Sequence, residues 1–128
     1  MASISTTRAA IKAAVSAVVR CYDYTPSNLP VPCAIVGFPS RYMPNDTFGD
    51  TAAFTIPVSI YVAYGTDRAA EDNLEAYLTS SGAGSVLAAI DAIGSNYAAS
   101  TVRDFGVLEA PNGQAYALGC VIDVDVWT

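Results

Sequence analysis

Paired carboxylates are the side chains of this sequence with the clearest potential for chemistry. Asp123 and Asp125 lie two residues apart in an alternating apolar segment, so they share one face of a predicted strand. Such a pair could bind a divalent cation or transfer protons. Because no third ligand lies nearby in the sequence, we expect both carboxylates to face solvent. For Glu71, Asp72 and Glu75 we likewise expect a solvated or interface helix surface rather than a metal site.

Nucleophilic catalysis has no support in the sequence. The 128-residue chain contains no histidine, which excludes histidine-activated nucleophiles and most zinc sites. We therefore interpret Ser80 and Ser81 as polar linker residues. The segment GAGS at residues 82–85 precedes a predicted helix, but it lacks the lysine and the spacing of a phosphate-binding loop. It is typical of a turn between two helices.

The three cysteines do not have the spacing of a metal or redox motif. Cys21, Cys33 and Cys120 contain no CxxC pair. One disulfide is possible in principle, but three reduced thiols in a protein made in a cytoplasm are the simpler expectation. We therefore predict no catalytic residue, no metal and no cofactor, and so no enzyme. A small enzyme that holds a metal with Asp123 and Asp125 is a remote alternative.

The charged residues are unevenly distributed. Twelve acids and six bases give a net charge of −6, so a broad surface that binds nucleic acid is not expected. Half of the positive charge precedes the first acidic residue and comes from Arg8, Lys12 and Arg20. Residues 67–75 are acidic instead, through Asp67, Glu71 and Glu75 among others. Both segments could be ordinary solvated faces, but their opposite charges also predict a head-to-tail contact between copies, which can close a ring.

The spacing of apolar residues predicts three helices. Residues 5–20 carry an apolar stripe that includes Ile11 and Val15. A second helix follows a Thr-Asp N-cap at residues 66–67 and buries Leu74 and its neighbours on one face. Ser85 is the expected N-cap of a third, short helix.

Alternation of apolar and polar residues predicts strands at residues 33–38, 54–64, 99–108 and 116–126. Pro57 interrupts the second strand, which therefore has either an edge or a bulge there. Asn112 and Gly113 are typical of a tight hairpin turn between the last two strands. Together these elements predict one α+β domain over residues 1–128. Its sheet would be mainly antiparallel and four-stranded, with the N-terminal helix and the central helix pair packed on one face.

A longer pattern in the sequence resembles a known family. The segments TDRAAEDNLEAYL at residues 66–78 and SGAGSV at residues 81–86, followed by Ala89 and Ile90, form an acidic helix linked to a short one. A long apolar strand precedes them, and the chain ends with DVDV at residues 123–126. In this order of elements the chain resembles the tail terminator proteins of long-tailed, siphovirus-type bacteriophages, especially those that infect actinobacteria.

This resemblance implies a virion protein without enzymatic activity. Such proteins form a ring, usually of six copies, that caps the tail tube, ends its polymerisation and joins the tail to the head connector. The implied partners are other copies of the chain, the tail tube protein and the head–tail connector protein, with no membrane. DNA would pass through the lumen without specific binding, as an acidic total charge favours. The protein would be made in the host cytoplasm and lie in the virion at the head–tail junction.

The segment at residues 39–51 is the candidate for contacts beyond the ring. It is rich in prolines and turn residues, which predicts a mobile hairpin or loop, and loops often carry function. We expect Arg41, Asp46 and Asp50 to line the lumen or to reach a neighbouring ring. A head-completion connector or a tail-tube subunit of the same virion is the alternative function.

Overall fold

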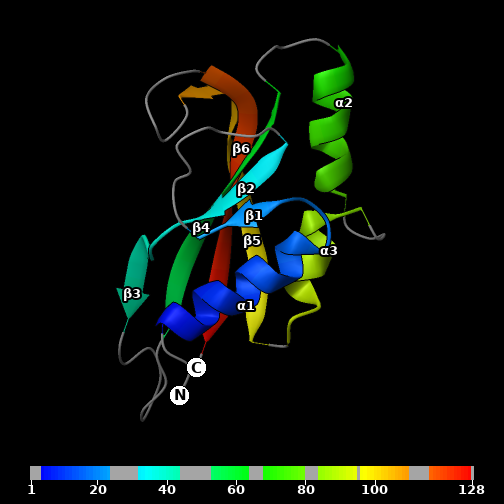
Figure 1. Cartoon of the computed structure of the whole chain (residues 1–128). Helices are drawn as coiled ribbons and strands as arrows, with labels where there is room; N and C mark the ends of the chain where they lie inside the picture. The colour runs from blue at the N-terminus through cyan, green and yellow to red at the C-terminus, as the bar shows by residue number, and fades with distance from the viewer. Residues whose placement is uncertain are drawn as a thin grey trace.

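One sheet and three helices make up the described part of the chain (Figure 1). The computed structural model describes residues 4–23, 32–43, 53–63, 68–79, 84–94, 96–109 and 116–127. The helices are α1 (Ile4–Ser16), α2 (Arg68–Tyr77) and α3 (Val86–Asp91). The strands are β1 (Cys21–Tyr22), β2 (Cys33–Val36), β3 (Arg41–Met43), β4 (Ala53–Ala63), β5 (Tyr97–Glu109) and β6 (Tyr116–Trp127).

The sheet is mixed. Five strands follow the order β1-β2-β4-β6-β5, and the short strand β3 also pairs with β4. The β1–β2 pair is parallel, whereas the other pairs are antiparallel. The protein is therefore α+β, but the prediction of an antiparallel four-stranded sheet is wrong. That prediction missed β1 and β3, which are too short to show an alternating pattern. It also extended the first helix to residue 20, whereas α1 ends at Ser16 and the chain enters β1 at Cys21.

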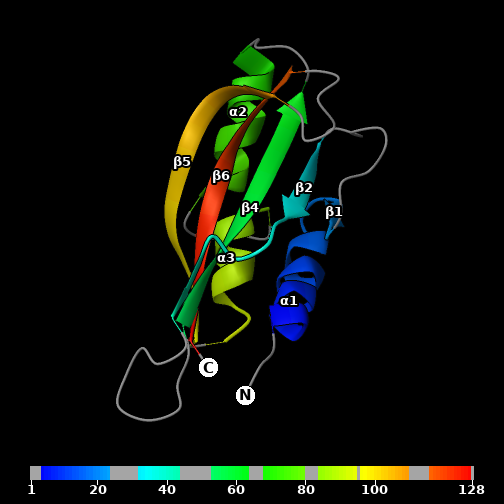
Figure 2. The same cartoon turned by 90° about the vertical axis from the view of Figure 1, so that its left-hand side faces the viewer.

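The core lies on one face of the sheet. Alternate residues of β4 and β6, such as Ile56, Ile60 and Ile122, are fully buried there. The same cluster contains Ile11 from α1 and Ile90 from α3, together with a leucine from α2. All three helices therefore cover this face, as Figures 1 and 2 show.

Ser85 is the N-cap of α3, as the sequence predicts. Its hydroxyl oxygen accepts a hydrogen bond from the Ala88 amide at 3.1 Å, which satisfies a free N–H group in the first turn of the helix. The same hydroxyl donates to the carbonyl oxygen of Thr79, just beyond α2. One buried side chain thus caps α3 and ties it to the end of α2.

Pro57 lies at an interruption of the strand that pairs with β4. The sequence predicts either an edge or a bulge at Pro57. β4 is not an edge strand, because it lies between β2 and β6, and its register against β6 runs through Pro57 without a bulge. The Gly37 amide donates to the Pro57 carbonyl oxygen at 2.9 Å, but proline has no N–H to return the bond. The partner strand therefore ends as β2 at Val36 and pairs again as β3, after Ser40 donates to the Thr55 carbonyl oxygen at 2.8 Å.

The edge strand β5 is irregular and strongly curved (Figure 2). Its register against β6 shifts between Arg103 and Gly106. Within this bulge Asp104 has a φ of 58° and Gly106 a φ of 129°, the second of which strongly favours glycine. The bulge leaves Phe105, between these two residues, 60% exposed at the edge of the sheet.

Replacing Gly119 by alanine tests how closely β4 and β6 approach each other. An added Cβ would overlap the Ile60 carbonyl oxygen, a backbone atom that cannot move without opening the β4–β6 pairing. We expect Gly119→Ala to lower the free energy of unfolding, measured in urea, by about 3 kcal/mol or more. In the control Gly84→Ala, the new methyl group meets no described atom within 4 Å, and we expect a change below about 1 kcal/mol. Equal effects of the two substitutions would contradict the close approach.

Candidate functional site

Arg8, a predicted interface residue, binds three carbonyl oxygens of its own chain. Nε donates to Gly37 at 3.0 Å, and Nη2 donates to Asp23 at 2.7 Å and to Val36 at 3.0 Å. The guanidinium carbon lies 4.4 Å from the centre of the Phe38 ring, a cation–π distance. Arg8 therefore joins α1 to the ends of β1 and β2. Any contact of Arg8 with a neighbouring copy would use a side chain that is already fixed in place.

The other two basic residues of the predicted interface are more accessible to a neighbouring copy. Lys12 lies 3.7 Å from the Asp23 carboxylate, and both side chains are about 40% exposed, so this ion pair contributes little to stability. Arg20 is exposed between α1 and β1. Both remain candidates for a contact with a neighbouring copy.

Truncating Arg8 tests its structural role. We expect Arg8→Ala to lower the free energy of unfolding by about 2–3 kcal/mol, because three carbonyl groups and an aromatic ring lose their partner. The control Arg20→Ala removes the same charge from an exposed position, and we expect less than about 0.5 kcal/mol. Urea unfolding followed by circular dichroism measures both. An Arg8→Ala variant as stable as Arg20→Ala would show that the contacts of Arg8 within the chain do not contribute to stability.

The predicted interface acids Glu71 and Glu75 line a groove between α2 and the bulge of β5. Both side chains are exposed, and Asp67 lies outside the described residues. The floor of the groove is apolar and comes from α2, β5 and β6, with a volume of about 560 Å³. The lining residues are Glu71, Leu74, Glu75, Leu78, Phe105, Gly106 and Leu118. We call this the α2–β5 groove.

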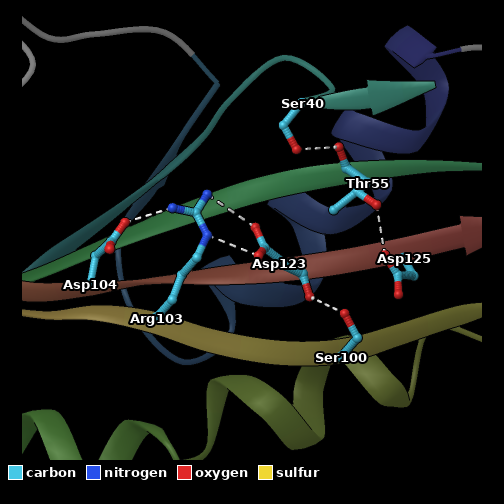
Figure 3. A network of polar contacts seen from close by, with 7 residues as sticks. All are labelled: Ser40, Thr55, Ser100, Arg103, Asp104, Asp123 and Asp125. Atoms are coloured by element: carbon cyan, nitrogen blue, oxygen red, sulfur yellow. Dashed lines mark hydrogen bonds and ion pairs between the residues drawn. The ribbon is translucent and has the colours of Figure 1, made fainter.

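The face of the sheet opposite the helices carries a polar network (Figure 3). The Arg103 guanidinium holds both oxygens of the Asp123 carboxylate, at 2.9 and 3.3 Å, and also binds Asp104 at 2.6 Å. The Thr55 hydroxyl donates to Asp125 at 2.7 Å. The two carboxylates that share a face in the sequence therefore each have a protein partner. The bidentate hydrogen bonds to Asp123, and its charge, raise the pKa of Arg103.

Arg103 was not recognised from the sequence. It lies in a weakly patterned strand, and two register shifts in β5 decide which residue of β6 it meets. The only sequence signal is a lone base in one arm of a hairpin whose other arm carries two acids. In the described residues, no group of three or more cysteine, aspartate or glutamate side chains could hold a metal ion.

Arg41, the first of the predicted lumen residues, begins β3 and lies at the edge of the polar face. It is exposed beside a hollow of about 200 Å³ that Thr55, Asp125 and Trp127 also line. Asp46 and Asp50 lie outside the described residues. The structure thus places Arg41 on a strand paired with β4 and near Asp125.

All three cysteines are free, as the sequence suggests, and all three are buried. Cys21 and Cys120 lie in the helix-covered core, and Cys33 lies in a small cluster on the opposite face. Burial raises the pKa of the Cys21 thiol to about 12 and those of Cys33 and Cys120 to about 11, from an ordinary value of 9.0.

These pKa values predict slow labelling and a loss of stability at high pH. At pH 8 the thiolate fraction of a group with a pKa near 11 is about 100-fold below normal, so Ellman's reagent should react at least about 100-fold more slowly with native than with unfolded protein. Thiols of the unfolded chain ionise near pH 9.0, whereas the buried ones stay protonated to about pH 11. Their contribution to folding is therefore complete below pH 9 and is lost as the pH rises towards 11. Rapid labelling of native protein at pH 8 would contradict this burial.

Comparisons with models of known protein families and with curated proteins found no match to this chain. Among the described residues, no helix combines the length and the apolar character needed to cross a membrane.

Proposed function

We propose that this chain is a structural subunit of a bacteriophage virion that assembles into a ring, with six copies as its resemblance to tail terminator proteins implies. The ring would cap the tail tube, end its polymerisation and join the tail to the head connector. It would act at the head–tail junction of the virion without enzymatic chemistry.

The helices that carry the resemblance support this proposal. Residues 68–77 form α2 and residues 86–91 form α3. Ser85 caps α3 and binds the backbone of Thr79, so the two helices are held together through this residue. The acidic helix and the short helix of the resemblance are thus joined by Ser85, and both pack against the core face of the sheet.

The observation that carries the proposal is the separation of charge between two helices of one layer. The basic residues of α1 lie beside β1 and β2, whereas Glu71 and Glu75 of α2 lie over β6 and the bulge of β5 (Figure 1). No ion pair in the described part of the chain joins α1 to α2. A basic surface and an acidic surface at different places on one copy favour a heterologous contact between copies, and such contacts close rings.

Particle size and charge reversal test the proposal. Native mass spectrometry and sedimentation velocity should show a discrete ring. We expect Lys12→Glu with Arg20→Glu to disrupt it, and Glu71→Lys with Glu75→Lys to do the same. Combining the two reversed charge sets in one chain should restore assembly only in part, because Lys12→Glu and Arg20→Glu again meet opposite charges whereas Arg8 keeps its positive charge.

Asp72→Lys is the matched control for charge reversal. It makes the same change on the same exposed helix, but Asp72 is not among the residues that line the α2–β5 groove. We expect the ring to persist in this variant. Open tubes of wild-type protein would support a tail-tube subunit instead, and a monomer at all concentrations would contradict the proposal.

A further inference from the structure

Two phenylalanines are exposed at opposite edges of the sheet. Phe38 is 73% exposed and lies in the link between β2 and β3, and Phe105 is 60% exposed in the bulge of β5. The link is hydrogen-bonded to β4 on the edge of β4 that faces away from β6. β5 is the edge strand at the opposite end of the sheet. Figure 1 shows the link on the left of the sheet and α2 on the right. Each copy therefore presents one aromatic ring at each edge.

The ring of Phe38 is held in a rigid, positively charged setting. At Pro57 the strand that pairs with β4 is interrupted. Hydrogen bonds from the backbone amides of Gly37 and Ser40 to β4 hold the link on both sides of Phe38. The Arg8 guanidinium stacks on the ring at 4.4 Å. Its bonds within the described residues use Nε and Nη2, so the N–H groups of Nη1 can face a partner. We call Phe38 with Arg8 the Phe38 knob.

The α2–β5 groove has complementary properties. Its floor of leucine side chains and Phe105 is apolar, and Glu71 and Glu75 supply negative charge at its border. Its volume of about 560 Å³ lies in the range of pockets that enclose small organic molecules, so it has room for a phenyl ring and part of a guanidinium group. Aromatic and arginine side chains in such apolar pockets commonly dominate binding energy.

We infer that the α2–β5 groove of one copy binds the Phe38 knob of the next copy, with Arg8 facing Glu71 and Glu75. The knob and the groove differ in surface and lie at opposite edges of the sheet, so this contact is heterologous. A copy that uses its knob still offers a free groove, and the contact repeats until a ring closes. The inference rests on the ring assembly proposed above and names the residues that hold the ring together.

Complementation between two defective variants tests this inference. Phe38→Ala removes the knob but keeps the groove, whereas Glu71→Lys with Glu75→Lys spoils the groove but keeps the knob. We expect each variant alone to be monomeric at concentrations where the wild type forms rings, with assembly weakened at least about 10-fold. An equimolar mixture should form heterodimers and nothing larger, because one intact contact forms and no further copy can add. Sedimentation velocity distinguishes these species.

Trp127→Ala is the matched control. Trp127 is also an exposed aromatic residue, at 41%, but it lies outside both the knob and the groove, so its variant should form rings. Circular dichroism should show that Phe38→Ala stays folded, since its side chain is mostly in solvent.

The possible results separate the inference from the proposed function. Rings of wild-type protein together with unchanged rings of Phe38→Ala would overturn the inference and leave the ring function standing. A mixture that stays monomeric would also overturn it. Rings of Phe38→Ala that fail to bind tail tubes would assign the knob to a different protein and overturn the contact between copies. A wild-type monomer would contradict both the inference and the function.

Discussion

The pairing of β4 with β6 is the constraint on which the rest of the structure depends. These two strands pair over most of their length, and their alternate side chains form the floor on which all three helices pack. Near one end, Gly119 lies against the carbonyl group of Ile60, where no side chain fits. The residues of β6 that alternate with the core residues point to the other face, where Asp123 and Asp125 belong to the polar network. The hydrogen bonds between β4 and β6 therefore set the positions of the side chains on both faces of the sheet.

Much of the fold could be predicted from the sequence, because long elements have a clear period. The alternation along β4 and β6 and the apolar spacing of α1, α2 and α3 are visible in the residues themselves, as is the cap at Ser85. The short strands β1 and β3 are not, because two or three residues cannot show a period. Pro57 is visible in the sequence as a disturbance of its strand, but the splitting of the partner strand into β2 and β3 is not. Whether proline ends a sheet, bulges it or splits its partner strand depends on which strand lies beside it.

The candidate site was less predictable, because charge is visible in a sequence and contact is not. The basic and acidic segments were found, yet nothing in them shows that Arg8 binds backbone carbonyl groups of β1 and β2. Phe38 and Phe105 carry no signal of exposure, since phenylalanine is usually buried. Their exposure comes from a split strand and a bulge, which are both consequences of strand pairing. Arg103 meets Asp123 for the same reason, through register shifts that no single strand encodes.

The burial of all three thiols has a consequence for the virion role proposed above, in which the particle leaves the cell. A virion component forms in a reducing cytoplasm and then persists in oxidising surroundings, where exposed thiols form disulfides or become oxidised. Here Cys33 is on the opposite face of the sheet from Cys21 and Cys120, and none of the three is exposed. The thiols of the folded chain are therefore shielded from the redox state of the medium. In the proposed role, its stability would rest on packing and hydrogen bonds that do not change when the particle leaves the host.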